Sequence, residues 1–229
     1  MRVKISYQTL LIPPPFAFGY TLDLNIKDDE TEIEFEMEYL NRDTITEDEI
    51  INEGFTTDDD FKWTGKLGNI WSERLSEIEH IELESNSNNE EIWMHFQVES
   101  EESNPSGHVL KVDEWDFKIQ ELIQAIYEKA KRELPLTVNL AIVKGSDLKE
   151  VKVLGYFETL TSEVNGQPLS WEKMQQAMNP VFSAEIEEEG TKKPGKPGIW
   201  IDLESDGQYY QLKLNNKSIS LISNILLAN

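Results

Sequence analysis

One amphipathic stretch, Asp113 to Leu134, most constrains how this chain can fold. Its apolar residues recur at spacings of three and four, which places them on a single stripe of an α-helix. They are Ile119, Leu122, Ile123, Ile126 and Ala130, with Trp115 and Leu134 extending the stripe at either end. Asp113 can cap the first turn, and Pro135 cannot continue the hydrogen-bond ladder. The pattern therefore predicts one long helix over residues 113–134, with one face that needs a partner.

The segments on both sides of this helix alternate between apolar and polar residues, as half-buried strands do. The clearest is a hairpin in which residues 22–26 and 33–39 flank a turn at residues 28–30. Further hairpins are predicted around Asn165-Gly166 and around residues 205–207, and a further strand over residues 78–84. These patterns predict an α+β fold in which antiparallel sheets built from hairpins pack against the long helix, with two or three short helices elsewhere.

Two local signals concern the first 60 residues. Thr46 and Glu49 fit a capping box at the start of a short helix. The three prolines at positions 13–15 impose an extended passage. Because apolar residues flank this passage on both sides, it is predicted to pack into the interior of the protein. The flanking residues are Leu11, Ile12, Phe16 and Phe18.

The chain is long enough for one large domain or two small ones. We expect a single domain over residues 1–229. The alternative is a division at the polar segment Glu101–Gly107, the most linker-like part of the sequence. It would separate an acidic, β-rich part (1–102) from an α+β part (107–229).

The net charge of −23 is unevenly distributed along the chain. Residues 1–102 contain 26 acids and 7 bases, a net of −19, whereas residues 103–229 contain 18 acids and 14 bases, a net of −4. Such a field repels phosphate backbones and anionic membrane surfaces and attracts cations and basic proteins. We therefore expect a basic protein partner, and neither nucleic acid nor a membrane. Solubility alone is the simpler reason for the charge.

The sequence contains no motif for a cofactor or for a known catalytic centre. There is no glycine-rich phosphate loop, no dinucleotide fingerprint, no Gly-x-Ser-x-Gly elbow and no His-Glu-x-x-His helix. The lack of cysteine excludes disulfides and thiolate metal sites and fits a reducing compartment. No apolar window is long enough to span a bilayer. We expect no cofactor, no bound metal and a cytoplasmic location.

The three histidines offer one candidate constellation. His80 and His95 fall on predicted strands, and pairing of these strands would bring the two imidazoles together near Glu79, Glu82 or Gln97. A metal site of two histidines and a carboxylate needs converging geometry that this spacing does not impose. Partly exposed histidines on a wet sheet face are the simpler interpretation.

The candidate partner-binding residues lie in two acidic clusters. One follows alternate positions of a strand in the first hairpin, and the other is a run of aspartates in a loop that leads to a tryptophan. The residues are Glu32, Glu34, Glu36, Glu38, Asp58, Asp59, Asp60 and Trp63. A solvated sheet face and a capped turn explain these clusters without a ligand. A calcium loop is disfavoured because Lys62 stands where a ligand should be.

These observations favour a non-enzymatic interaction protein whose acidic surface, centred on residues 32–60, meets a basic partner. An immunity or inhibitor role against a basic toxin or nuclease would suit the charge. The alternative is a carboxylate-based hydrolase that acts on a glycan or uses a divalent metal, because aromatic faces beside carboxylates also build sugar sites. No pair of acids in the sequence stands out as catalytic.

Overall fold

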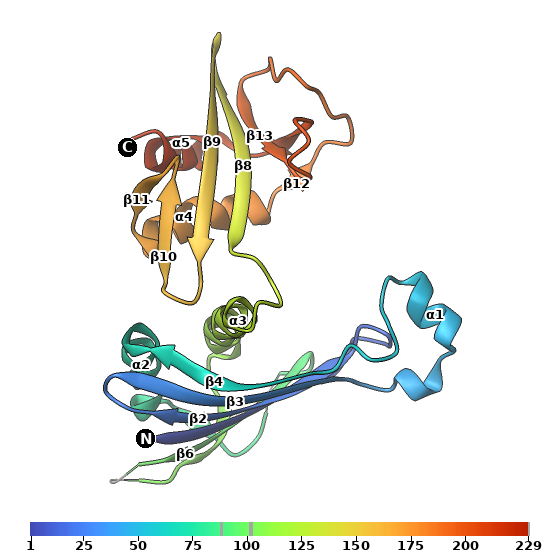
Figure 1. Ribbon diagram of the computed structural model, residues 1–229, viewed down its shortest axis with the longest axis vertical. Helices are drawn as coiled ribbons and strands as arrows, with labels where there is room; N and C mark the ends of the chain where they lie inside the picture. The colour runs from blue at the N-terminus through green and yellow to red at the C-terminus, as the bar shows by residue number, and fades with distance from the viewer. Residues whose placement is uncertain (88, 101–102, 229) are drawn as a thin grey trace. The chain divides into compact units, whose positions relative to one another are not determined.

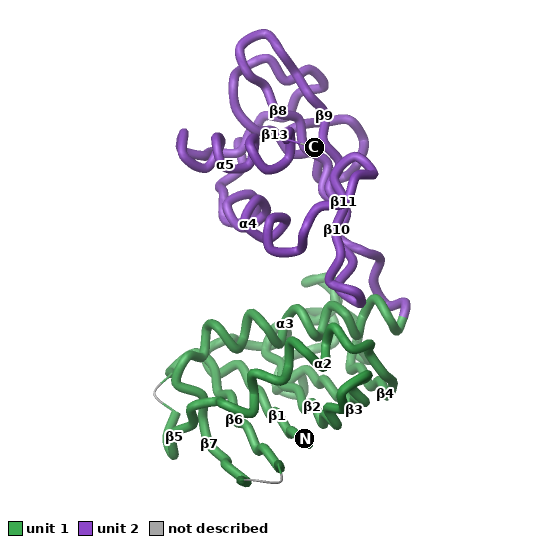
Figure 2. The backbone as a smooth tube through the Cα atoms, turned by 90° about the vertical axis from the view of Figure 1, so that its left-hand side faces the viewer, with its two compact units in different colours: residues 1–130 green, residues 131–229 purple. Residues whose placement is uncertain are grey.

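The computed structural model describes residues 1–87, 89–100 and 103–228 of the chain. These residues form an α+β structure with two antiparallel sheets of seven strands each and five α-helices. The predicted α+β class with antiparallel sheets is therefore confirmed. The chain divides into two compact units, residues 1–130 and residues 131–229, each built around one sheet (Figure 2). No helix within the described ranges is long and apolar enough to cross a membrane.

The sheet of the first unit has the strand order β4-β3-β2-β1-β6-β7-β5 (Figure 1). Its strands are β1 (Arg2–Thr9), β2 (Phe18–Ile26), β3 (Glu30–Tyr39), β4 (Phe61–Gly68), β5 (Leu83–Glu84), β6 (Ile92–Glu99) and β7 (Ser106–Val109). The predicted hairpin of residues 22–39 is confirmed as β2 and β3. Along β3, Ile33, Phe35 and Met37 are buried whereas Glu34 and Glu36 are exposed. This alternation gives the sheet one apolar face and one charged face.

Helices cover the apolar face of this sheet. They are α2 (Asn69–Leu75) and α3 (Val112–Lys129); the unit also contains α1 (Glu47–Asn52) and two short 3-10 helices, η1 (Arg42–Thr44) and η2 (Ser76–His80). Ile119, Leu122 and Ile126 of α3 are fully buried, and α3 lies across the sheet (Figures 1 and 2). Arg74 of α2 donates a hydrogen bond to the buried carboxylate of Glu121 in α3. The charged face of the sheet has no helix on it and is called the open face below.

The long helix predicted over residues 113–134 is shorter in the structure, because α3 ends at Lys129 and spans 18 residues. The amide of Ala130 still donates to the carbonyl of Ile126, but Lys131 then turns left-handed with a φ of 58°. A left-handed residue at this position ends a helix, and glycine or asparagine usually supplies it. Since lysine stands there, the sequence gives no signal, and the predicted end before Pro135 was wrong.

Two other local predictions were also wrong. The strand expected over residues 78–84 is a 3-10 helix to His80, followed by a two-residue strand, β5. The proline passage does not pack wholly into the interior. Pro15 is buried, but Leu11, Ile12 and Phe16 around it are exposed.

The sheet of the second unit has the order β11-β10-β9-β8-β13-β14-β12. Its strands are β8 (Leu136–Lys144), β9 (Asp147–Tyr156), β10 (Thr161–Val164), β11 (Gln167–Leu169), β12 (Glu185–Ile186), β13 (Gly198–Asp202) and β14 (Tyr209–Lys213). Helices α4 (Trp171–Phe182) and α5 (Asn216–Leu226) bury Met174, Ile222 and Leu226 in one core with the sheet. The hairpin predicted at Asn165-Gly166 is confirmed, since both turn residues have positive φ.

The boundary between the two compact units lies between Ala130 and Lys131. Of the linker-like segment 101–107, residues 101 and 102 lie outside the described residues. Residues 103–107 belong to the first unit and lead into β7. How many parts of the chain fold independently stays a prediction.

Candidate functional site

The glutamates predicted as partner-binding residues lie along β3 on the open face. Lysines of the same unit neutralise two of them. Glu32 Oε1 lies 2.6 Å from Lys27 Nζ and 3.2 Å from Lys66 Nζ. Glu36 Oε1 lies 3.2 Å from Lys62 Nζ. Register explains these pairs, because β4 places Lys66 and Lys62 directly opposite Glu32 and Glu36.

Hydrogen bonds from Lys27, Asn25 and Lys66 lower the pKa of Glu32 to about 2. The carboxylate therefore stays ionised beside its lysines across the physiological range. Glu34 and Glu38 make no ion pair with any residue that the structure describes. The open face is thus a ladder of both charges, with a hollow of about 660 Å³ whose walls include lysine as well as glutamate.

Trp63 does not share a face with these glutamates. It lies in β4 directly opposite the buried Phe35, so its side chain is on the helix-covered side of the sheet. The indole lies across Gly65, where an added Cβ would meet its ring carbon Cζ2 at 2.2 Å. The structure therefore separates Trp63 from the acidic clusters with which the sequence grouped it.

The aspartates 58–60 lie in a projection at one end of the same sheet, where two chain connections meet (Figure 1). One connection joins β1 to β2, and the other runs from the end of β3 through η1 and α1 to β4. We call residues 10–17 and 40–60 together the acidic tip. The amide of Leu40 donates to the carbonyl of Ala17, and the rings of Phe16 and Phe55 meet edge to face at 5.4 Å.

Arg42 is the centre of the acidic tip. Its Nε donates to the carbonyl of Pro15 at 3.2 Å, and its Nη1 donates to the carbonyl of Thr56 at 2.8 Å and to Asp59 Oδ2 at 2.9 Å. The guanidinium carbon lies 3.8 Å and 4.8 Å from the ring centroids of Tyr39 and Phe55. Only 11% of its side chain is exposed. A buried, planar, five-donor group is well suited to joining several loop carbonyls in this way.

The three aspartates have different surroundings. Burial acts to raise the pKa of Asp59, but hydrogen bonds from Thr56 and Arg42 outweigh it and lower that pKa. Asp60 Oδ1 accepts a hydrogen bond from the amide of Tyr39, while Asp58 is exposed. Asp59 and Asp60 thus hold the tip in shape, and Asp58 is the one of the three that faces solvent without such a bond among the described residues.

Large apolar side chains are exposed on the acidic tip. Leu11 is 69% exposed and Ile51 of α1 is 53% exposed. Leu10, Ile12 and Phe16 are each more than two-fifths exposed. None of these five apolar residues was among the candidate partner-binding residues predicted from the sequence. The signal that it missed is the apolar run at positions 10–12, which breaks the alternation of β1 just before three prolines prevent a strand from continuing.

The tip is also strongly acidic. Residues 40–60 contain eight acids and one base, a net of −7. The base is Arg42, which is already paired with Asp59. None of the other seven acids of the tip makes an ion pair with a described residue. In contrast to the open face, the tip therefore presents uncompensated negative charge around exposed apolar side chains.

His80 and His95 do not meet, because His80 ends η2 while His95 pairs across strands with His108. The imidazole centroids of His95 and His108 are 5.2 Å apart, and Trp93 stacks on His95 at 5.8 Å with nearly parallel rings. Nδ1 of His108 donates to the carbonyl of Met94 at 2.9 Å if that nitrogen holds the proton. The three rings form an aromatic cluster on the open face.

A first prediction concerns Arg42. Replacing it by methionine removes three charge-assisted hydrogen bonds, one to the β1–β2 connection and two within the β3–β4 connection. We expect amide hydrogen exchange in residues 10–17 and 53–60 to accelerate by about tenfold or more, while exchange in α3 stays unchanged. The exposed Arg2→Met on the open face is the matched control. Unchanged exchange in both tip segments of the Arg42 variant would contradict the role given to this residue.

A second prediction concerns His95, whose pKa is lowered first by burial and then by the charge of His108. At a pH between this lowered pKa and the ordinary value near 6.5, the unfolded chain binds a proton at His95 more readily than the folded chain does. The free energy of unfolding therefore falls as the pH falls through that window. We expect the wild type to lose unfolding free energy relative to His95→Gln between about pH 7 and about pH 5. The exposed His80→Gln should track the wild type. A pH-independent difference for His95→Gln would refute the assignment.

Among the described residues, no group of three or more His, Asp or Glu side chains is placed to hold a metal ion. The alternative of a carboxylate-based hydrolase stays a prediction without a named pair of acids. No protein-family model, curated protein or solved structure matches this chain.

Proposed function

We propose that the first unit is a protein-binding module and that the acidic tip is its contact surface for a basic partner protein. The observation that supports this best is the combination of exposed Leu11, Phe16 and Ile51 with seven uncompensated carboxylates on one projection. Exposed apolar side chains rimmed by charge are typical of protein–protein contact sites. Single leucines scattered over a protein surface are not surrounded by charge in this way.

Charge selects the partner. Unit 1 contains 31 acids and 10 bases, a net of −21, whereas unit 2 contains 13 acids and 11 bases, a net of −2. A basic surface is attracted over a Debye length of about 8 Å at physiological salt, and like charges exclude acidic competitors. An inhibitor of a basic enzyme such as a nuclease is the form of this function that the charge favours.

Preorganisation favours the same function. Arg42 joins the two connections before any partner arrives, so binding does not have to order the loops. Fixing a loop in advance reduces the entropy lost on association. Rigid apolar anchors, supported from behind by a buried guanidinium, can enter recesses of a partner at low cost.

The test is affinity capture from an extract of the source organism with immobilised wild-type chain and two variants. The double variant Leu11→Ser with Ile51→Ser removes the apolar anchors, and Phe117→Ser removes an equally exposed apolar residue of α3 outside the tip. We expect a basic protein that the wild type and Phe117→Ser retain, that the double variant loses, and that elutes between about 50 mM and about 500 mM salt.

Circular dichroism of each variant verifies that the fold is retained. Retention of the same proteins by the double variant would contradict the proposal. So would capture that does not depend on salt, an acidic partner, or no protein whose capture depends on the tip.

A further inference from the structure

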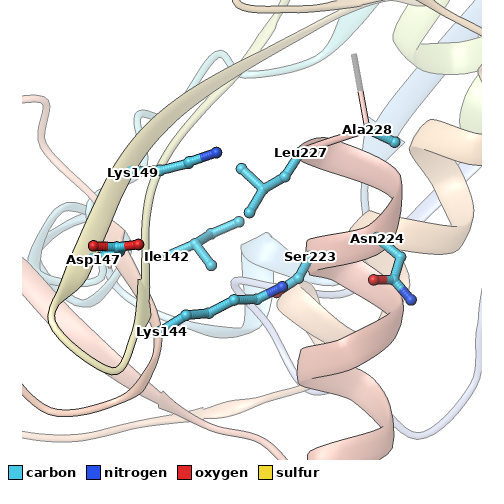
Figure 3. A pocket seen from close by; sticks show the side chains of 8 residues that line it. All are labelled: Ile142, Lys144, Asp147, Lys149, Ser223, Asn224, Leu227 and Ala228. Carbon is cyan, nitrogen blue, oxygen red and sulfur yellow. The ribbon is translucent and has the colours of Figure 1, made fainter.

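The second unit has a pocket of about 360 Å³ between the end of the β8–β9 hairpin and the last turn of α5 (Figure 3). Lys144, Asp147 and Lys149 line it from the hairpin, and Ser223 lines it from the helix. The apolar Ile142, Leu227 and Ala228 and the polar Asn224 complete the lining. Figure 3 shows Lys144 and Lys149 of the hairpin and Leu227 of the helix end directed toward the space between the two elements.

The hairpin places its three charged residues on the side of the sheet that α5 covers. Ile142, which is buried in the core of the unit, lies directly opposite Lys149, and Lys144 lies opposite Asp147. Residues opposite each other on antiparallel strands project from the same face. Charged residues therefore occupy strand positions that face the helix at this end of the sheet. Apolar residues would be expected at these positions if the helix packed directly against them.

The charged side chains of the pocket form no ion pairs within the described structure. Neither Lys144 nor Lys149 makes an ion pair with any described residue, and Asp147 makes none either. With two ammonium groups and one carboxylate, the lining has a net charge of +1. A monoanion fits that balance. The negative end of the α5 dipole points into the same region and opposes a dianion such as phosphate more strongly than a monoanion.

Ser223 supplies an independent indication of a ligand. The residue is 1% exposed, and its Oγ has no hydrogen-bond partner in the part of the chain that the structure describes. A hydroxyl in the last turn of a helix can donate to a carbonyl of the preceding turn, and leaving a buried hydroxyl without any partner is destabilising. A polar ligand atom in the pocket would give this hydroxyl its missing hydrogen bond.

From these features we propose that the pocket binds a small organic monocarboxylate. The carboxylate lies between the ammonium groups of Lys144 and Lys149 and accepts a hydrogen bond from Ser223 Oγ. The alkyl part of the ligand contacts Ile142 and Leu227. The site is in the second unit and is independent of the acidic tip.

The probe for the test is hexanoate, titrated into the full ¹⁵N-labelled chain and followed by NMR. Lys144→Met and Lys149→Met each remove one positive charge, and Lys152→Met is the control because Lys152 lies on the other face of β9. We expect saturable shifts at the amides of residues 142–149 and 223–227. Each of the first two variants should weaken binding by about fivefold or more, and Lys152→Met by less than about twofold.

Ser223→Ala should weaken binding without lowering the thermal stability of the free chain, since it removes an unpaired hydroxyl. Hexylamine has the opposite charge on a six-carbon chain, hexanol has the chain without a charge, and inorganic phosphate has negative charge without a chain. Each should bind more weakly than hexanoate. Linear, unsaturable shifts with hexanoate would overturn the proposal. Equal or tighter binding of any of the other three probes would overturn it as well, as would equal losses in all three lysine variants.

Discussion

The geometry of the acidic tip depends on one buried cation. Arg42 reaches the β1–β2 connection at Pro15 and the β3–β4 connection at Thr56 and Asp59, and two aromatic rings lie against its guanidinium. These loops are far apart in the sequence and contain few other buried residues. Without the cation, the exposed apolar side chains would have no fixed support, and Asp59 would lose the partner that helps to keep it ionised.

The position of Arg42 also explains why the number of acidic residues alone does not identify the proposed contact surface. The open face of the first unit is rich in glutamate, yet β4 supplies lysines in register with Glu32 and Glu36, so much of this face is compensated. On the tip the one base lies inside, and the acids outside make no ion pair with any described residue. A surface whose negative charges are unpaired attracts a basic protein more strongly than a surface whose negative charges are neutralised by the protein's own lysines.

Local patterns in the sequence were sufficient to predict the α+β class, the hairpins and the apolar face of the main helix. Each of these follows from the periodicity of consecutive residues. The end of α3 did not follow, because Lys131 adopts a left-handed conformation that its side chain does not signal.

The proposed contact surface was harder to predict than the fold. Asp58, Asp59 and Asp60 were candidate partner-binding residues in the sequence, but their different surroundings depend on Arg42 and Tyr39, which are distant in the chain. Trp63 was grouped with acids from which the pleat of β4 separates it. Long-range register and loop packing decide such placements, and neither is encoded in a short window.

The central claim is that the acidic tip contacts a basic protein, and site-specific photo-crosslinking tests it most directly. A benzophenone amino acid would be placed at position 51 on the tip and, as the reference, at position 117 on α3, both of which are exposed. The account predicts that a basic protein crosslinks from position 51, that high salt suppresses the crosslink, and that position 117 gives none. Crosslinking of the same protein from position 117 but not from position 51, or no crosslink from either, would contradict it.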